Sequence, residues 1–147
     1  MNVVIDTNVF LNVIRTEPGL VEASEELLRR ALRGEVTGLA SSVALIEVRW
    51  VLHEKKEFGK SEKAVAMIEE IVDIVPVDGE IAKEAIDIKI ERSLELLDSI
   101  HAASAASRNA VLVTRDDDLR RRVEDIVRLN TPEQVLVEIK KSKHPVQ

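Results

Sequence analysis

The sequence predicts an α/β fold built around a parallel sheet. Short β-branched runs alternate with longer helical patterns along the chain, as expected for such a sheet. The first run, Val3–Ile5, is continuously apolar, which is typical of a strand covered on both faces. A length of 147 residues, with 45% hydrophobic and 33% charged residues, suits one domain with one core.

The β-branched runs mark the strands, and apolar residues at helical spacing fill the segments between them. In chain order we expect strands over 2–6, 36–40, 74–77, 111–114 and 127–129. We expect helices over 8–14, 20–33, 43–57, 61–73, 81–92, 98–107 and 119–123, and a last helix from Thr131-Pro132 onward.

Turn and capping signals set the limits of these elements. They are the break Glu17-Pro18-Gly19, the helix end at Gly34, the caps Ser41, Ser42 and Ser61, and the turn Asp78-Gly79. Residues 1–141 are therefore predicted to form a single domain, and residues 142–147 a frayed tail.

The composition narrows the class of protein. No apolar run approaches the roughly 20 residues of a membrane span, and the N-terminus carries no export signal. The absence of cysteine excludes disulfides and fits a cytoplasmic protein. A net charge of −6 argues against a protein that coats nucleic acid, and 2% aromatic residues argue against a base-stacking platform.

Four isolated acids are the most informative feature of the chain. Each lies in or at the end of an apolar stretch: Asp6, Glu47, Asp98 and Asp116. A buried carboxylate without a partner costs several kcal/mol or takes up a proton. Four of them indicate a fold that gathers them around a cation, and without cysteine the expected ion is Mg²⁺ or Mn²⁺.

Chain geometry predicts that the acids meet. Functional groups of parallel sheets collect beyond the carboxyl ends of the strands, where Asp6 and Asp116 lie. Glu47 lies about one turn inside a helix that starts at the same edge. Asp98 reaches this edge only if its helix extends across the sheet or starts earlier, near Ser93.

Structural roles compete with this interpretation. Asp6 and Asp98 are each placed where an acid can cap a helix, and Asp116 can be an acid of a turn. Capping cannot explain Glu47, which can instead pair with Arg49 or Arg108. His101 shares a helical face with Asp98, and we expect it to pack or hydrogen-bond near the site.

The order of four segments resembles the PIN-domain nucleases, above all the VapC-type toxin ribonucleases of toxin–antitoxin pairs. The segments are DTNVFL, SSVALIEVRWVL, LLDSIHAASAA and LVTRDDDL, at 6–11, 41–52, 96–106 and 112–119. The resemblance covers essentially the whole chain. It implies a three-layer α/β/α sandwich with a central, mainly parallel sheet of four or five strands, a Mg²⁺- or Mn²⁺-dependent phosphodiesterase site, and RNA as substrate.

The resemblance also assigns roles to residues. The acids of the family match Asp6, Glu47, Asp98 and Asp116. Polar residues that orient these acids match Asn8 and Thr114, and a further acid matches Asp118. It also implies a small antitoxin as partner and a homodimer.

The chemistry of metal-dependent hydrolysis refines these roles. We expect Asp6, Asp98 and Asp116 to be metal ligands, with Glu47 holding a second metal or the attacking water. Arg115, beside Asp116, is expected to contact a phosphate of the substrate. Attack by water predicts 5′-phosphate and 3′-hydroxyl products.

Other interpretations remain open at this point. A catalytically silent module that binds RNA or protein is one, and a phosphatase with Asp6 as nucleophile is another, although Asn8 replaces its general acid. Apolar residues on more than one face of the 43–57 helix predict a partner surface, with Trp50 as its anchor.

Overall fold

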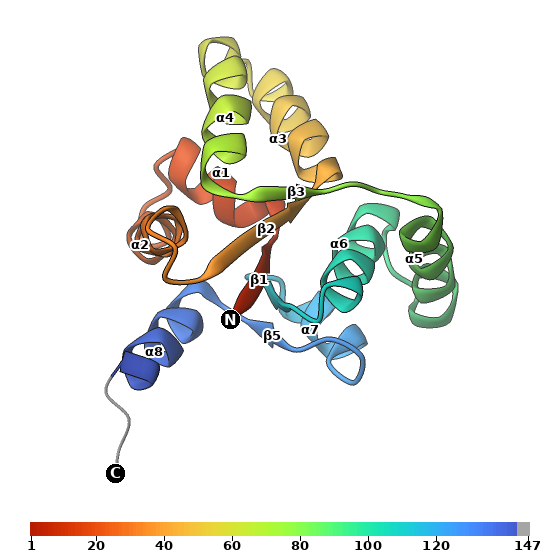
Figure 1. The fold of residues 1–147 in the computed structure, drawn as a ribbon. Coiled ribbons are helices and arrows are strands. Elements are labelled where there is room, and N and C mark those ends of the chain that lie inside the picture. Colours follow the sequence, from red (N-terminus) through yellow and green to blue (C-terminus); the bar gives the residue numbers. More distant parts are fainter. Residues whose placement is uncertain (144–147) are drawn as a thin grey trace.

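A computed structural model describes residues 1–143 of the chain. A parallel sheet of five strands lies at its centre, in the order β3-β2-β1-β4-β5 (Figure 1). The strands are β1 (Asn2–Ile5), β2 (Thr37–Ser41), β3 (Asp73–Val75), β4 (Val111–Val113) and β5 (Leu129–Asn130). The predicted α/β fold with a parallel sheet is confirmed.

Helices cover both faces of this sheet. They are α1 (Thr7–Ile14), α2 (Val21–Leu32), α3 (Ser42–Glu54), α4 (Phe58–Ile71), α5 (Gly79–Arg92), α6 (Leu96–Ser107), α7 (Asp117–Val123) and α8 (Pro132–Lys143). None of the helices within residues 1–143 is long and apolar enough to cross a membrane.

The alternation of side chains along the strands divides the core in two. In β1, Val3 and Ile5 pack into a cluster with residues of α1, α2, α3, α4 and α8. Val4 points the other way, into a cluster with residues of α5, α6 and α7. The two clusters on opposite faces of one sheet make the molecule a three-layer α/β/α sandwich (Figure 1).

Several boundaries differ from those expected. Helix α3 ends at Glu54 rather than at 57, because Lys56 adopts a left-handed conformation with φ of 58°. Helix α4 then starts at Phe58, so Ser61 lies inside the helix and caps nothing; its hydroxyl accepts a hydrogen bond from Arg49 Nε at 3.2 Å. At the other end of the chain, α8 continues to Lys143, and the remainder of the expected tail, 144–147, lies outside the described residues.

The register of the sheet positions the functional edge. Ile5 of β1 pairs with Val113 of β4, so the next residues along each strand, Asp6 and Thr114, leave the sheet side by side. The backbone N–H of Asp6 still donates to Val113 O at 2.9 Å, which fixes Asp6 at the end of the sheet. Two adjacent parallel strands therefore deliver polar side chains to one place.

Candidate active site

Thr114 joins two of the predicted acids. Its buried hydroxyl donates to Asp6 Oδ2 at 2.8 Å and accepts from the backbone N–H of Asp116 at 3.1 Å. Asp6 is itself only 4% exposed. It stands at the N-cap position of α1 but makes no side-chain cap hydrogen bond, so capping does not account for it. The structure therefore brings Asp6, Thr114 and Asp116 together.

The Asp116 carboxylate caps a helix and still has acceptor positions left for the site. Its Oδ1 accepts from the backbone N–H of Leu119 at 3.0 Å, so the side chain does cap α7. A carboxylate has two oxygens with about four acceptor positions, and the cap uses one of these. Capping and a role in the site are therefore compatible for Asp116.

Helix α6 brings Asp98 to the same edge. It leads into β4 through a link of only three residues, 108–110, so it must run antiparallel to β4 and start at the edge where β4 ends. It begins at Leu96, after Ser93 with φ of 55° in the turn that follows α5. Asp98 thus lies in the first turn of α6 and is not its cap. Of the two expected routes to the site, the structure shows the earlier helix start, at Leu96.

Charge around Asp98 shows how closely the acids are grouped. Burial raises the pKa of Asp98, and the negative charges of Asp6 and Asp116 raise it further, to about 6. Glu47 adds a smaller contribution in the same direction, against a lowering by His101. Four acids from four separate segments therefore act on one another, and the fold holds negative charge there at a cost.

His101 lies among these acids. It is 0% exposed, and its Nε2–H donates to Glu47 Oε1 at 2.7 Å and lies 3.5 Å from Asp6 Oδ1. Burial lowers the pKa of His101, but the hydrogen bond to Glu47 and the charges of Asp6, Glu47 and Asp98 raise it above its ordinary value. The hydrogen bond to Glu47 and the neighbouring negative charges therefore favour the protonated imidazole, whereas burial disfavours it.

Glu47 is oriented from two directions. Its Oε1 accepts from His101 and also from the hydroxyl of Thr7, at 2.8 Å. Burial raises the pKa of Glu47, whereas the bond and charge of His101 lower it, with the net result below the ordinary value. The predicted alternatives, pairing with Arg49 or with Arg108, are not observed within residues 1–143, where Arg49 donates to Ser61.

Two of the residues predicted for the site are exposed to solvent. Asn8 is exposed, and the buried residue that reaches an acid is its neighbour Thr7. Asp118 is also exposed and forms ion pairs with Arg121 and Arg122 on its own helix, at 3.6 and 2.9 Å. These positions therefore do not orient the acids as expected.

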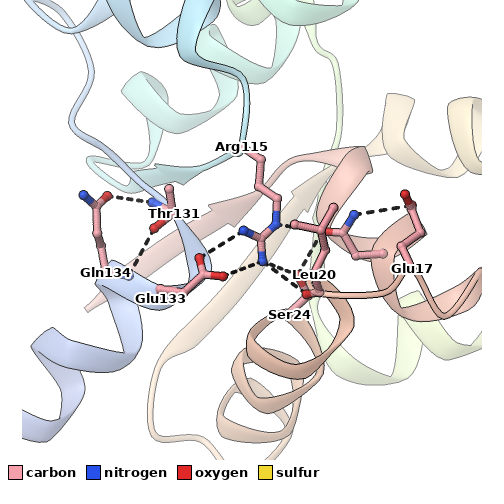
Figure 2. Close-up of polar contacts among 8 residues, drawn as sticks. Glu17, Leu20, Ser24, Arg115, Thr131, Glu133 and Gln134 are labelled. Atoms are coloured by element: carbon pink, nitrogen blue, oxygen red, sulfur yellow. Dashed lines mark hydrogen bonds and ion pairs between the residues drawn. The ribbon is translucent and has the colours of Figure 1, made fainter.

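Arg115 is bound by several protein groups, and its expected contact with a phosphate stays a prediction. Figure 2 shows its guanidinium directed toward α2 and α8, where it binds Ser24 Oγ, the carbonyl of Leu20 and the carboxylate of Glu133. These protein groups use most of the donors of the guanidinium.

The donor chemistry of the site suits a hard cation, because every candidate ligand is a carboxylate oxygen. Within the part of the chain that the structure describes, however, no three Asp, Glu or His side chains already form a group that could hold a metal ion. The acids are close enough to repel one another but are not arranged as a finished set of ligands.

The sequence was compared with models of known protein families. The family model described as the PIN domain matches residues 3–124. No curated protein matches the sequence closely enough to count as a relative.

The fold is also similar to chains of solved structures. One comes from VapBC2 of Rickettsia felis bound to a promoter DNA fragment, with TM-score 0.73 and 18% identity over 89% of this chain and 98% of that chain. Another comes from VapBC-1 of nontypeable Haemophilus influenzae, with TM-score 0.67 and 16% identity over 90% and 99%. A third comes from DNA-bound VapBC of Salmonella typhimurium, with TM-score 0.65 and 22% identity over 90% and 98%. With the family model matching most of its length, the chain belongs to the PIN domain family.

Proposed function

We propose that this protein is a divalent-metal-dependent endoribonuclease that hydrolyses RNA to 5′-phosphate and 3′-hydroxyl ends. The observation that carries the proposal is the gathering of Asp6, Glu47, Asp98 and Asp116 at one edge of the sheet, where burial together with the neighbouring negative charges raises the pKa of Asp98 to about 6. A bound divalent cation would offset the repulsion among these carboxylates and so stabilise the folded protein. Membership of the PIN domain family supports the same function.

The residues fit Mg²⁺ or Mn²⁺ by their chemistry. Asp6, Asp98 and Asp116 would hold the ion through their carboxylate oxygens. Such an ion, when bound, lowers the pKa of a water molecule and neutralises charge on the phosphate. Thr114 keeps the Asp6 carboxylate in place for this purpose, as hydrogen-bond partners of ligands commonly do.

Glu47 is the residue best placed to hold the attacking water. Both of its hydrogen bonds, from Thr7 and His101, go to Oε1, which leaves Oε2 for a further donor. The same bonds restrain the side chain, so a water at Oε2 would be oriented rather than mobile. A pKa below the ordinary value keeps Glu47 ionised and able to accept a proton.

A partner protein and a cellular setting belong to the proposal as well. The matching chains come from structures described as VapBC, and one is a toxin–antitoxin complex of Klebsiella pneumoniae. This similarity supports a role as the toxin of a type II pair, held by a small antitoxin in the cytoplasm. A phosphatase is disfavoured, because Asn8 occupies the position of its general acid and is exposed.

The test is cleavage of single-stranded RNA by the purified protein. We expect fragments to appear with Mg²⁺ or Mn²⁺ and to disappear when the ion is removed with excess EDTA, because no carboxylate alone neutralises the phosphate. Cleavage should return when Mn²⁺ is added back beyond the EDTA. Binding of RNA without any cleavage would instead indicate a silent binding module.

The exposed apolar face of α3 supports a homodimer. Trp50 is 59% and Ile46 67% exposed, and the Trp50 ring stacks on His53 at 5.9 Å, followed by Phe58 of α4. Large aromatic side chains that protrude from a surface commonly anchor interfaces. We expect Trp50→Ala to shift the protein from dimer to monomer in sedimentation at low micromolar concentration. The interface is refuted if the wild type already sediments as a monomer there.

A further inference from the structure

Arg115 connects three parts of the fold through one side chain. Its Nε–H donates to Asn12 Oδ1 of α1 at 2.9 Å, and one terminal nitrogen, Nη2, contacts the carbonyl of Leu20 and the hydroxyl of Ser24, each at 3.2 Å. The guanidinium also forms two hydrogen bonds with Glu133 of α8, at 3.0 and 2.8 Å. Figure 2 shows it between α2 and the start of α8.

The partners of Arg115 in α1 and α2 are buried and bonded to each other. Asn12 is 3% and Ser24 0% exposed, and the Ser24 hydroxyl donates to Asn12 Oδ1 at 3.0 Å. Buried polar groups of this kind have few alternative partners, so they hold the guanidinium in one orientation. The planar fork of arginine suits such a fixed arrangement better than the flexible ammonium of lysine.

The partner in α8 is fixed as well. Glu133 lies in the first turn of α8, where Thr131 and Gln134 form a reciprocal capping box (Figure 2). The strand before this helix, β5, is paired with β4, and the backbone N–H of Thr114 donates to Asn130 O at 3.0 Å. Arg115 and Glu133 therefore follow two strands that are paired with each other.

The backbone of Arg115 lies inside the candidate active site. Its neighbours in sequence are Thr114, which donates to Asp6, and Asp116, whose carboxylate faces Asp98 closely enough to raise its pKa. No residue separates the side chain that is clamped from the acid that follows it. A guanidinium locked to α1, α2 and α8 thus restricts the turn that aims the Asp116 side chain.

We infer that Arg115 is a positioning residue, whose clamp by Asn12, Ser24 and Glu133 sets the Asp116 carboxylate relative to Asp6. This inference rests on the proposed function, in which Asp116 helps to hold a divalent cation. The clamp also accounts for an arginine directly beside an acidic site: Glu133 compensates its charge on the side away from the acids.

The experiment compares Arg115→Ala with Arg128→Ala. Arg128 also pairs with an acid of α8, Glu138, but its side chain is exposed and its backbone does not adjoin an acid of the site. The first measurement, on the metal-free proteins, is hydrogen exchange at the Leu119 amide, which donates to Asp116 Oδ1. The second is the Mn²⁺ dissociation constant, well below the unfolding temperature of each variant.

We expect Arg115→Ala to speed exchange at Leu119 beyond any change at the core amide of Val4, and to weaken Mn²⁺ binding about 10- to 100-fold. Arg128→Ala should change neither quantity. A lower unfolding temperature for Arg115→Ala, with the Leu119 exchange and the dissociation constant unchanged, would show that the clamp only stabilises the fold and would overturn the inference.

Two further variants keep the outcomes distinct. If Arg115→Ala fails to fold, Glu133→Ala tests the clamp, because it leaves the bonds of Arg115 to Asn12, Leu20 and Ser24; we expect the same changes, smaller in size, and their absence would overturn the inference. Asp116→Asn tests the proposed function separately. If it binds Mn²⁺ as tightly as the wild type, the proposed site fails, and the Leu119 exchange still decides whether Arg115 positions Asp116.

Discussion

Asp6→Asn is expected to reduce RNA cleavage at least about 100-fold, because loss of even an indirect hydrogen-bond partner of a metal ligand commonly costs 10- to 100-fold. The change keeps the size of the side chain and one acceptor oxygen, so the bond from Thr114 can persist to the amide oxygen. What is lost is one of the negative charges that attract a cation. Initial rates of RNA cleavage under saturating Mn²⁺ measure the effect.

The same variant should also respond differently to metal without any substrate. Removing one charge from the cluster relieves repulsion on Asp98, so the unfolding temperature of the metal-free protein should rise. The additional stabilisation by Mn²⁺, which arises from binding to the native state, should largely disappear. Calorimetry with and without Mn²⁺ tests both points, with Asp87→Asn on the exposed face of α5 as the control. Equal Mn²⁺-induced shifts in wild type and Asp6→Asn would contradict the proposed site.

Asp98→Asn is expected to stabilise the metal-free protein at neutral and alkaline pH, but not in acid. The pKa of Asp98 in the folded protein is about 6, against an ordinary value of 3.8. Each pKa unit corresponds to about 1.4 kcal/mol, and allowing for solvent screening at this half-buried group we expect a gain of roughly 1–2 kcal/mol in the free energy of unfolding.

The sign of the change in stability with pH depends on whether the folded or the unfolded state holds the proton of Asp98. As pH rises through 3.8 the unfolded chain loses the proton of Asp98, whereas the folded protein keeps it until pH is about 6. The wild type therefore loses stability over this window, and Asn, which does not ionise, does not. Urea unfolding in EDTA at about pH 4 and about pH 8 measures the difference. A gain of equal size at both pH values would mean that the effect is not electrostatic.

The convergence of the acids could be predicted where it depends on strand order alone. Asp6 and Asp116 follow strands that a parallel sheet must end at the same edge, and the register of Ile5 with Val113 makes this concrete. The position of Asp98 was harder to predict, because it depends on the direction of α6 across the sheet. A link of three residues between α6 and β4 determines that direction.

Side-chain direction could not be predicted in the same way. Thr7 and Asn8 are both polar and adjacent, and only the start of α1 at Thr7 turns the threonine inward to Glu47. Arg115 adjoins an acid in sequence, yet its side chain leaves on the opposite side, toward buried groups of α1 and α2 that lie about 100 residues away in the chain. The partners of His101 likewise come from two distant segments. Such contacts follow from packing between elements, which local sequence patterns do not contain.

The ends of the RNA fragments test the central claim most directly. Cleavage by the 2′-hydroxyl of RNA leaves a 2′,3′-cyclic phosphate and needs an acid and a base, but the structure separates the two histidines that it describes: His101 is buried among the acids, and His53 is exposed beside Trp50. Attack by water, held by Glu47 and assisted by a divalent cation, leaves a 5′-phosphate and a 3′-hydroxyl. We therefore expect 5′-phosphate ends on fragments made in Mn²⁺ and no fragments in EDTA. Cyclic phosphate ends, or undiminished cleavage in EDTA, would contradict this account of the four acids.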